Sequence, residues 1–288
     1  MKTIRDPWLK LREGINREDY DLIKELQERC IREDQTTLKL ELDYKIGVYS
    51  GKDSAGLPIN EFMYFDGHEL IGYMGICDFG GPDTPLEVNG MVHPEYRRQG
   101  VFRTLSRHVM AEWRRRSPQN MLLLTDRESE AGQAFIQGTG ARYHHSEHEM
   151  YLRINRPEIN NDLESITFRK ATNADAWEIH RQNAIYFGDK LGNEETSDPG
   201  VGMILPEGIY GLGVLPEYCG KGYGRTTLLK VIDKLKEANA GDIMLQVAVE
   251  NANALRLCQS CGFVENSTMD YYELKLAGLS RSDFLFVR

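Results

Sequence analysis

The chain has 288 residues, of which 41% are hydrophobic and 27% are charged, and its formal net charge is −9. An acidic surface repels the phosphate backbone, which disfavours a nucleic-acid-binding protein. The sequence shows no apolar run of about 18 residues and no apolar leader after Met1, so we expect neither a membrane span nor a secretory signal. Five cysteines, an odd number, favour reduced thiols, and we expect a cytoplasmic protein.

The first part of the chain predicts a helix followed by three strands. Apolar residues recur at helical spacing over Asp19–Arg32. Residues 37–49 give no clear pattern. An Asp66–Gly67 turn joins Glu61–Phe65 to Leu70–Cys77 as a β-hairpin, and a strand follows over Leu86–Val92.

A glycine-bearing turn and a second α/β segment come next. The helix after the turn places Val101, Leu105, Val109 and Trp113 four residues apart on one face. A buried strand, a helix and closing strands follow, and they are expected over Met121–Leu124, Ser129–Gly138 and Tyr143–Leu152. The predicted order is β-β-β-turn-α-β-α-β.

One stretch of ten residues occurs twice, as His93–Phe102 and as Leu215–Gly224. Equivalent positions are 122 residues apart, and this offset holds without a gap over about sixty residues. Such a long common register indicates a duplicated half. We therefore predict two domains, residues 1–156 and 164–288, joined by the polar linker Asn155–Asp162.

The second half repeats the order of the first in shorter form. Its expected strands and helices are, in order, Ile166–Arg169, Asp175–Phe187, Ile209–Leu215, a helix bearing Leu228, Ile232 and Leu235, then Ile243–Val249, Asn253–Ser260 and Met269–Leu276. Residues 277–288 receive no assignment. Arg12 to Arg97 spans 85 residues, whereas Arg169 to Cys219 spans 50. The second half therefore lacks about 35 residues of the arm that precedes the turn.

A strand, a glycine turn and a helix N-terminus together suit an anionic ligand. Backbone N–H groups converge there, the helix dipole favours negative charge, and glycine allows the ligand to approach the backbone. Lys221 lies inside the second turn, where phosphate contact is a better explanation than packing. The arginines Arg114–Arg116 are better explained as favourable charge at a helix C-terminus.

Both turns resemble the signature of the GNAT superfamily of N-acetyltransferases, Gln/Arg-x-x-Gly-x-Gly/Ala. A further resemblance is the helix Asn251–Ser260 followed by Cys261, Gly262 and Phe263. The tandem arrangement is similar to that of mycothiol synthase and related double-domain acetyltransferases. The resemblance implies an α/β fold with a mixed sheet in each of two GNAT-like domains, the second with a shortened N-terminal arm.

The resemblance also implies an acetyl-CoA co-substrate, no metal, and direct transfer of the acetyl group to a small-molecule or peptide amine. The residues that it assigns to the coenzyme are Val92, Arg97, Arg98, Gln99, Gly100, Val101 and Phe102 in the first half, and Leu215, Cys219, Gly220, Lys221, Gly222, Tyr223, Gly224 and Asn253 in the second. Each turn departs once from the signature, at Phe102 and at Cys219.

The acid and base of the family are harder to find in this sequence. The usual acid, a tyrosine, falls at Ile136 and Cys258, and one usual base position falls at Leu124 and Gln246. Glu87 is the carboxylate nearest to a family base, and its alternative is an exposed glutamate at a strand end. Three tyrosines could reach a site but are more typical of strand packing, namely Tyr151, Tyr271 and Tyr272.

Two other groups of residues favour structure over chemistry. Cys258 and Cys261 are one helical turn apart with no second pair at metal-ligand spacing, which favours core packing over zinc. His144 and His148 share a strand face without a further ligand. The sequence leaves two functions open: an N-acetyltransferase, or a non-catalytic acyl-CoA-binding or scaffolding protein.

Overall fold

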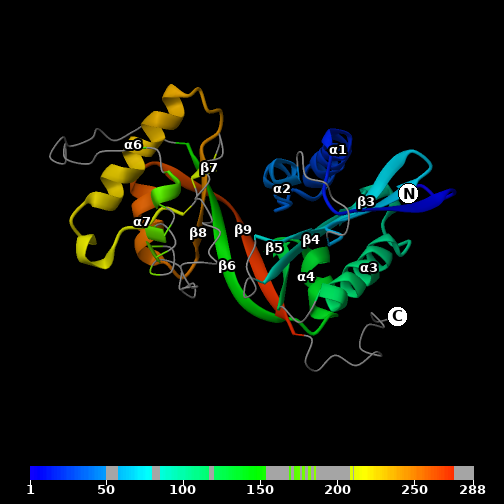
Figure 1. Ribbon diagram of the computed structural model, residues 1–288. Coiled ribbons are helices and arrows are strands. Elements are labelled where there is room, and N and C mark those ends of the chain that lie inside the picture. Colours follow the sequence, from blue (N-terminus) through cyan, green and yellow to red (C-terminus); the bar gives the residue numbers. More distant parts are fainter. Residues whose placement is uncertain are drawn as a thin grey trace. The chain divides into compact units, whose positions relative to one another are not determined.

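The computed structural model describes residues 1–49, 58–79, 85–116, 120–153, 208–209 and 211–275, together with a few positions between 169 and 185. The chain forms two compact units that do not follow the sequence halves. Unit 1 contains residues 1–146 and 267–288, and unit 2 contains residues 147–266. Figure 1 gives the element labels used below.

The strands of the described chain are hydrogen bonded in the order β1-β2-β3-β4-β5-β9-β6-β8-β7. Their bounds are Pro7–Arg12 (β1), Glu61–Asp66 (β2), Glu69–Cys77 (β3), Leu86–Val92 (β4), Met121–Asp126 (β5), Arg142–Leu152 (β6), Gly208–Ile209 (β7), Met244–Ala248 (β8) and Phe263–Leu274 (β9). β4 and β5 are parallel, as are β7 and β8, whereas β1 to β4 are joined antiparallel. The sheet is therefore mixed, in agreement with the fold expected from the sequence.

Helices cover both faces of the unit 1 strands (Figure 1). Helices α1 (Arg17–Asp34) and α2 (Leu42–Tyr49) lie on one face, and α3 (Val101–Arg116) and α4 (Glu130–Gln137) on the other. Asn16 and Ser129 cap α1 and α4, because each side chain accepts a hydrogen bond from a backbone N–H of the first turn. Alternation along β4 sends Val88 to the α3 face and Met91 to the α1 face.

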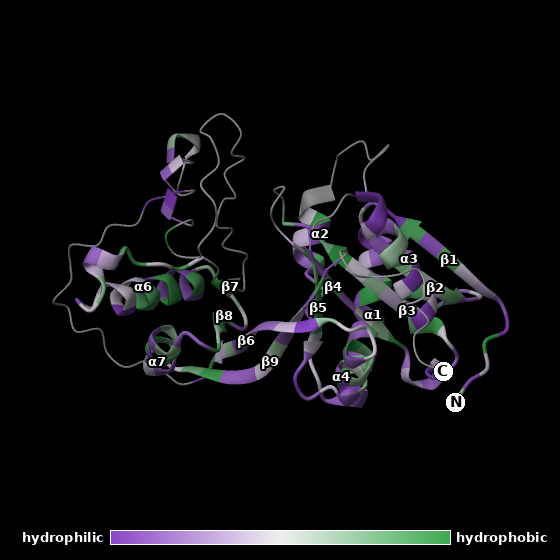
Figure 2. Ribbon diagram, turned by 90° about the horizontal axis from the view of Figure 1, so that it is seen from below, coloured by the Kyte–Doolittle hydropathy of each residue, from purple (hydrophilic) through white to green (hydrophobic). Residues whose placement is uncertain are grey.

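Unit 2 has a smaller described core. Helices α6 (Tyr223–Glu237) and α7 (Ala252–Ser260) pack their apolar sides with β8 in one cluster. Figure 2 shows both hydrophobic and hydrophilic residues along α6, as its amphipathic pattern requires. Asn251 caps α7 at the position that corresponds, 122 residues later, to Ser129 of α4.

The last strand of each sequence half, β6 in the first and β9 in the second, pairs with a strand of the other half. β5 of the first half pairs antiparallel with β9, whereas β8 of the second half pairs antiparallel with β6. The two registers are equivalent: Leu123 lies opposite Tyr272, and 122 residues apart, Leu245 lies opposite Met150. The two halves therefore exchange their last strands, β6 and β9, and the strand register stays the same in both.

Because of this exchange, the compact units differ from the two expected domains. Residues 1–156 and 164–288 remain a prediction for the extent of each repeat. The compact units differ from those ranges, because residues 267–288 fall with unit 1 and residues 147–153 with unit 2. The expected linker Asn155–Asp162 and the unassigned residues 277–288 lie outside the described residues, as does most of the expected pair Ile166–Arg169 and Asp175–Phe187.

Several expected boundaries are corrected by the structure. β7 covers Gly208–Ile209, not Ile209–Leu215, and Gly211 adopts φ 66° just after it. β9 begins at Phe263, earlier than the expected Met269, and Tyr143–Leu152 lies in one long strand. Two elements were not expected, β1 and α2. β1 pairs all six of its residues with β2, which compensates for its exposed, mixed sequence.

Candidate functional site

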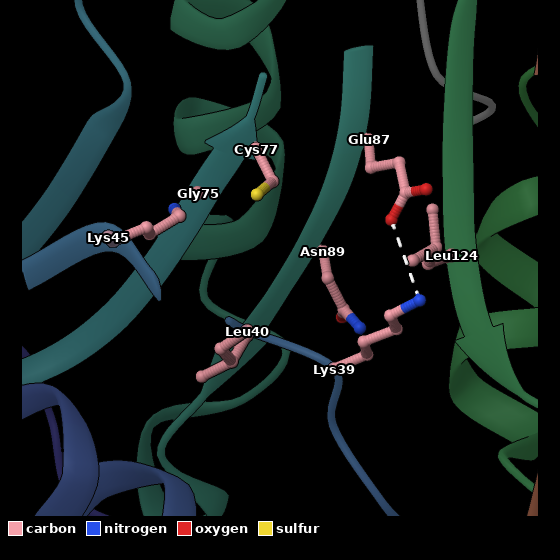
Figure 3. Close-up of a pocket in the computed structure, with 8 residues that line it drawn as sticks. All are labelled: Lys39, Leu40, Lys45, Gly75, Cys77, Glu87, Asn89 and Leu124. Carbon is pink, nitrogen blue, oxygen red and sulfur yellow. Dashed lines mark ion pairs between the residues drawn. The ribbon is translucent and has the colours of Figure 1, made fainter. Parts of the chain in front are cut away.

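A cavity lies where β4 and β5 of unit 1 stop pairing. The two strands pair at Leu86–Met121, Glu87–Leu122 and Val88–Leu123, and no further pair continues the ladder. Asn89 and Leu124, the next residues on each strand, both line the cavity (Figure 3). The cavity volume is about 10 Å³, room for about one water molecule, and it opens into a wider space of about 200 Å³ that includes solvent. Its remaining lining residues are Lys39, Leu40, Lys45, Gly75, Cys77 and Glu87.

Glu87 lies inside this cavity rather than at an exposed strand end. Its side chain is 17% exposed, and its Oε2 lies 3.9 Å from Nζ of Lys39 (Figure 3). Lys39 comes from the segment between α1 and α2. Its Nζ donates a hydrogen bond to the Tyr271 hydroxyl at 2.6 Å. A carboxylate, an ammonium and a hydroxyl from three distant parts of the sequence therefore meet at the opening between the strands.

A second set of charges is buried beside the cavity. Lys45 of α2 donates to Glu61 of β2 and to the hydroxyl of Tyr73 of β3, each at 3.0 Å. The Tyr73 hydroxyl also donates to the Glu61 carboxylate. Burial, together with the negative charge of Glu61, raises the pKa of Tyr73 well above its ordinary value. All three side chains are almost fully shielded from water, so this group fixes the cavity wall as a rigid unit.

The first turn follows β4 directly. Arg97 donates through Nε to the Val92 carbonyl and through both terminal nitrogens to Asp34 of α1, at 2.6 Å each. The Gln99 side chain donates to the carbonyl of Lys2 and accepts from the backbone N–H of Ile4. Both side chains are thus engaged by the protein itself, and the groups left to contact a ligand are chiefly backbone.

The first two residues of α3, Val101 and Phe102, both pack against the protein. Val101 is buried in the core beneath the turn. Phe102 packs edge-to-face on Phe135 of α4, with ring centroids 4.6 Å apart. The large residue at this position of the signature therefore fills a space between two helices.

The second turn is the more open of the two. Gly222 precedes α6 with no side-chain cap, and the Cys219 thiol is exposed, within 3.6 Å of the Leu215 carbonyl. Lys221 places its Nζ 5.7 Å from the ring centroid of Tyr218, and Tyr223 packs edge-on to that ring. A Cβ on Gly224 would come within 3.2 Å of Leu257, which explains a small residue there.

The two turns share one backbone conformation. Arg98 and Gly100 have φ values of 63° and 84°, and their equivalents Gly220 and Gly222 have 74° and 85°. A Cβ added to Gly100 or Gly220 meets no described atom within 4 Å, so the space over both turns is open. Left-handed residues before a helix turn successive N–H groups inward, which suits a phosphate group. Both turns therefore fit the anionic part of a nucleotide.

The remaining expected site residues divide between packing and exposure. Asn253 lies in the first turn of α7 and accepts a hydrogen bond from Arg256, whereas Asn251 is the cap. Ile136 and Cys258, at the positions of the usual acid, are buried, and burial raises the pKa of the Cys258 thiol to about 11.

No sequence motif pointed to Lys39, and for Tyr271 the sequence pattern favoured strand packing. Tyr271 is hidden because it arrives on the closing strand of the other half, opposite Leu124. Its neighbour Tyr272 points to the other face, where its hydroxyl donates to Gln133. Neighbouring residues of a strand point to opposite faces of the sheet, so Tyr271 and Tyr272 lie on different faces. Which face each one takes follows only from the pairing of β9 with β5.

Among the described residues, no group of three or more His, Cys, Asp or Glu side chains could hold a metal ion. Within the same residues, no helix is long and apolar enough to cross a membrane.

Comparison with known proteins identifies a family match and similar folds. Residues 168–263 match the acetyltransferase (GNAT) family. A spermidine N(1)-acetyltransferase of Vibrio cholerae is 43% identical over 53 residues, which is 18% of this chain and 31% of that protein. The chain thus spans about a third of the length of the curated relative that it matches.

Two solved structures are similar over nearly the whole chain. A GCN5-related N-acetyltransferase from Sphaerobacter thermophilus has a TM-score of 0.71 at 17% identity, covering 93% of this chain and 95% of that one. A tandem GNAT protein from the clavulanic acid biosynthesis pathway has a TM-score of 0.62 at 13% identity, covering 96% and 100%. At these identities the likeness shows the fold. The chain therefore has the fold of the GNAT acetyltransferases, and its residues 168–263 carry the sequence of that family.

Proposed function

We propose that the chain is an acetyl-CoA-dependent N-acetyltransferase that transfers the acetyl group directly to an amine. The observation that carries the proposal is the cavity between β4 and β5, with Glu87 on its wall. The same strand leads from Glu87 into the first glycine turn. A coenzyme whose phosphates lie on that turn would thus reach the opening between the strands with its thioester.

Glu87 is the proposed general base. An amine must lose a proton to become a nucleophile, and a shielded carboxylate within the cavity can accept it. Glu41 lies near the same lysine as Glu87, at 3.8 Å from Nζ of Lys39, so two carboxylates lie close to this ammonium group. These charges favour a cationic small-molecule or peptide amine, and the matched relative from Vibrio cholerae is a spermidine acetyltransferase.

We place the acceptor site in unit 1, because the arm before the turn is complete there. The segment between α1 and α2, helix α2 and strand β3 line the cavity together with β4 and β5. The second half has Ile209 in place of Glu87 and is shorter upstream of its turn. We propose that its turn also binds the coenzyme, and more tightly than the first, because Gly220, Gly222 and Gly224 allow closer approach. A cytoplasmic location remains part of this proposal.

The test is acetyl-CoA consumption against a panel of amines that includes spermidine. We expect thioester loss only when an amine is present, and a fall in kcat of at least about 100-fold for Glu87→Gln. Glu25→Gln, an exposed change on α1, is the matched control and should keep full activity. Equal activity in both variants would exclude Glu87 as the base.

The two turns are separated by matched variants. Gly100 and Gly222 have φ values of 84° and 85°, so alanine at either position measures backbone strain and glutamate adds repulsion of phosphate. Calorimetry with coenzyme A should show a larger loss of affinity for Gly222→Glu than for Gly100→Glu, each relative to its alanine control. Turnover should instead fall most in Gly100→Glu. Activity that survives Gly100→Glu but disappears in Gly222→Glu would move the reaction to the second half.

A second function, acyl-CoA binding without catalysis, is favoured by one observation. Both positions of the usual acid hold buried residues without a hydroxyl, Ile136 and Cys258. Coenzyme binding without turnover of any amine in the panel would support this alternative.

A further inference from the structure

The ammonium group of Lys39 is held as an amine substrate would be held. Its Nζ lies 2.6 Å from the Tyr271 hydroxyl, 3.8 Å from Glu41 and 3.9 Å from Glu87. It lies 5.2 Å from the centroid of the Tyr271 ring, on the hydroxyl side of that ring. Only 13% of the side chain is exposed. Two carboxylates and a hydroxyl are groups that select a primary ammonium ion.

The segment that carries Lys39 is anchored on both sides. The backbone N–H and the hydroxyl of Thr37 both donate to Asp126 at the end of β5, each at 2.7 Å. Gln27 of α1 donates to the Leu38 carbonyl, and Leu40 is buried in the core beneath α1. These contacts hold the segment in place, and Figure 3 shows the Lys39 side chain pointing toward Glu87 and Leu124.

We propose that Lys39 is an internal acceptor, so that its side-chain amine occupies the acceptor position and is acetylated by bound acetyl-CoA when no other amine competes. The inference rests on the proposed reaction at the first site. Lys39 and Leu124 line the same cavity as Glu87, the proposed base, so the amine needs no change of site to react.

The chemistry is that of the proposed reaction with the substrate supplied by the chain. Glu87 accepts one proton from the ammonium, which leaves a neutral amine with a free electron pair. The nitrogen attacks the carbonyl carbon of the thioester, a C–N bond forms and the C–S bond breaks. The departing thiolate takes up the second proton of the nitrogen, giving free thiol and a neutral acetyl-lysine. The modified side chain no longer attracts Glu41 and Glu87.

The test uses the full chain with acetyl-CoA and no added amine. A protease that cleaves after acidic residues releases residues 35–41, in which Lys39 is the one lysine. Mass spectrometry should show Lys39 acetylated at least about tenfold faster than Lys2, although the Lys2 side chain is 44% exposed. The rate constant should not depend on protein concentration, and Glu87→Gln should lower it at least about tenfold.

Two results would overturn the inference. One is Lys39 reacting no faster than the exposed Lys2, which is what uncatalysed acetylation by solvent-borne thioester produces. The other is an equal Lys39 rate in wild type and Glu87→Gln. A parallel sample with spermidine keeps the two proposals distinct: transfer to spermidine there, with Lys39 unmodified in the sample that lacks an added amine, rejects the internal acceptor and leaves the N-acetyltransferase standing. If neither amine reacts although coenzyme binds, both are rejected.

Discussion

Arg98 and Gly220 occupy equivalent places in the two turns and share a left-handed backbone, with φ values of 63° and 74°. An L-residue with a side chain is strained in this conformation, whereas glycine is not. The first turn therefore tolerates strain that the second avoids. The difference lies in one residue, because the turns agree in backbone conformation two residues later, at Gly100 and Gly222.

This relationship predicts that alanine lowers the free energy of unfolding more at Gly220 than at Arg98. Gly220→Ala adds a Cβ to a left-handed residue and should lower the free energy of unfolding by about 1 kcal/mol. Arg98→Ala keeps a Cβ that is already present and should change it by less than about 0.5 kcal/mol. Urea unfolding of both variants checks the pair. A loss below about 0.5 kcal/mol for Gly220→Ala would mean that the second turn relaxes out of the left-handed region.

Cys219 should report coenzyme binding at the second turn. It is exposed, whereas the other four cysteines are buried. Burial raises the pKa of Cys30 and Cys258 to about 11, so at neutral pH they hold little of the reactive thiolate. Brief treatment with iodoacetamide should modify Cys219 at least about tenfold faster than the others.

Alkylation of Cys219 in the presence of coenzyme A tests whether the ligand binds at this turn. Coenzyme A lying on residues 219–224 should slow the alkylation of Cys219, and the Gly222→Glu variant should lose that protection. Unchanged alkylation at saturating coenzyme A would place the ligand away from the second turn.

The buried group around Lys45 should be sensitive to the loss of one partner. Lys45→Met leaves the Glu61 carboxylate without its cation in a nearly dry place, which should cost about 3 kcal/mol of unfolding free energy. Arg17→Ala removes an exposed pair with Asp21 and should cost less than about 0.5 kcal/mol. Thermal and urea unfolding compare the two. Similar values would show that water or protonation compensates Glu61.

Asp270 should stabilise unit 1 although it belongs to the second sequence half. Its carboxylate accepts hydrogen bonds from Arg127 at 2.8 Å, from Ser146 at 2.6 Å and from Gln133 at 3.1 Å. Asp270→Ala leaves these donors unpaired at the junction of β5, β6 and β9. We expect a loss of about 2 kcal/mol or more.

Glu273→Gln on the same strand is the control. Glu273 makes its ion pair with the exposed Lys275 and should contribute less than about 1 kcal/mol. Hydrogen exchange can locate the effect, because protection should fall in β5 and in β9 together for Asp270→Ala. A loss confined to unit 2 would contradict the pairing of these strands.

The part of the fold that local patterns determine was predictable. Apolar spacing located α1, α3 and α6, and the Asp66–Gly67 turn located the β2–β3 hairpin. The repeat offset also predicted that the two turns would match, and their φ values agree. Local patterns failed for β1 and α2, whose sequences have weak periodicity and which depend on pairing with β2 and packing with α1.

The candidate site was predictable only in part, for a topological reason. Glu87 and the first turn lie within one short stretch of sequence, and the second turn repeats the first, so all three could be named from the sequence. Tyr271 reaches Lys39 because β9 crosses to unit 1, and nothing in a repeat with equivalent strands tells which half each closing strand joins. Strand choice is decided by contacts distant in sequence, such as Asp270 with Arg127.

The exchanged strands also set the order of events during synthesis. β6 leaves the ribosome soon after β5. It is the equivalent of β9 in the first half, so it can pair with β5 in the register that β9 has in the folded chain. The partner of β6, β8, is made about a hundred residues later, and β9 follows it. Until Leu274 has emerged, β5 therefore has either an open edge or the wrong neighbour, and a nascent chain is exposed to strand-mediated association for that interval. A first half expressed alone keeps β6 but never receives Tyr271, so Lys39 loses the hydroxyl that accepts its hydrogen bond.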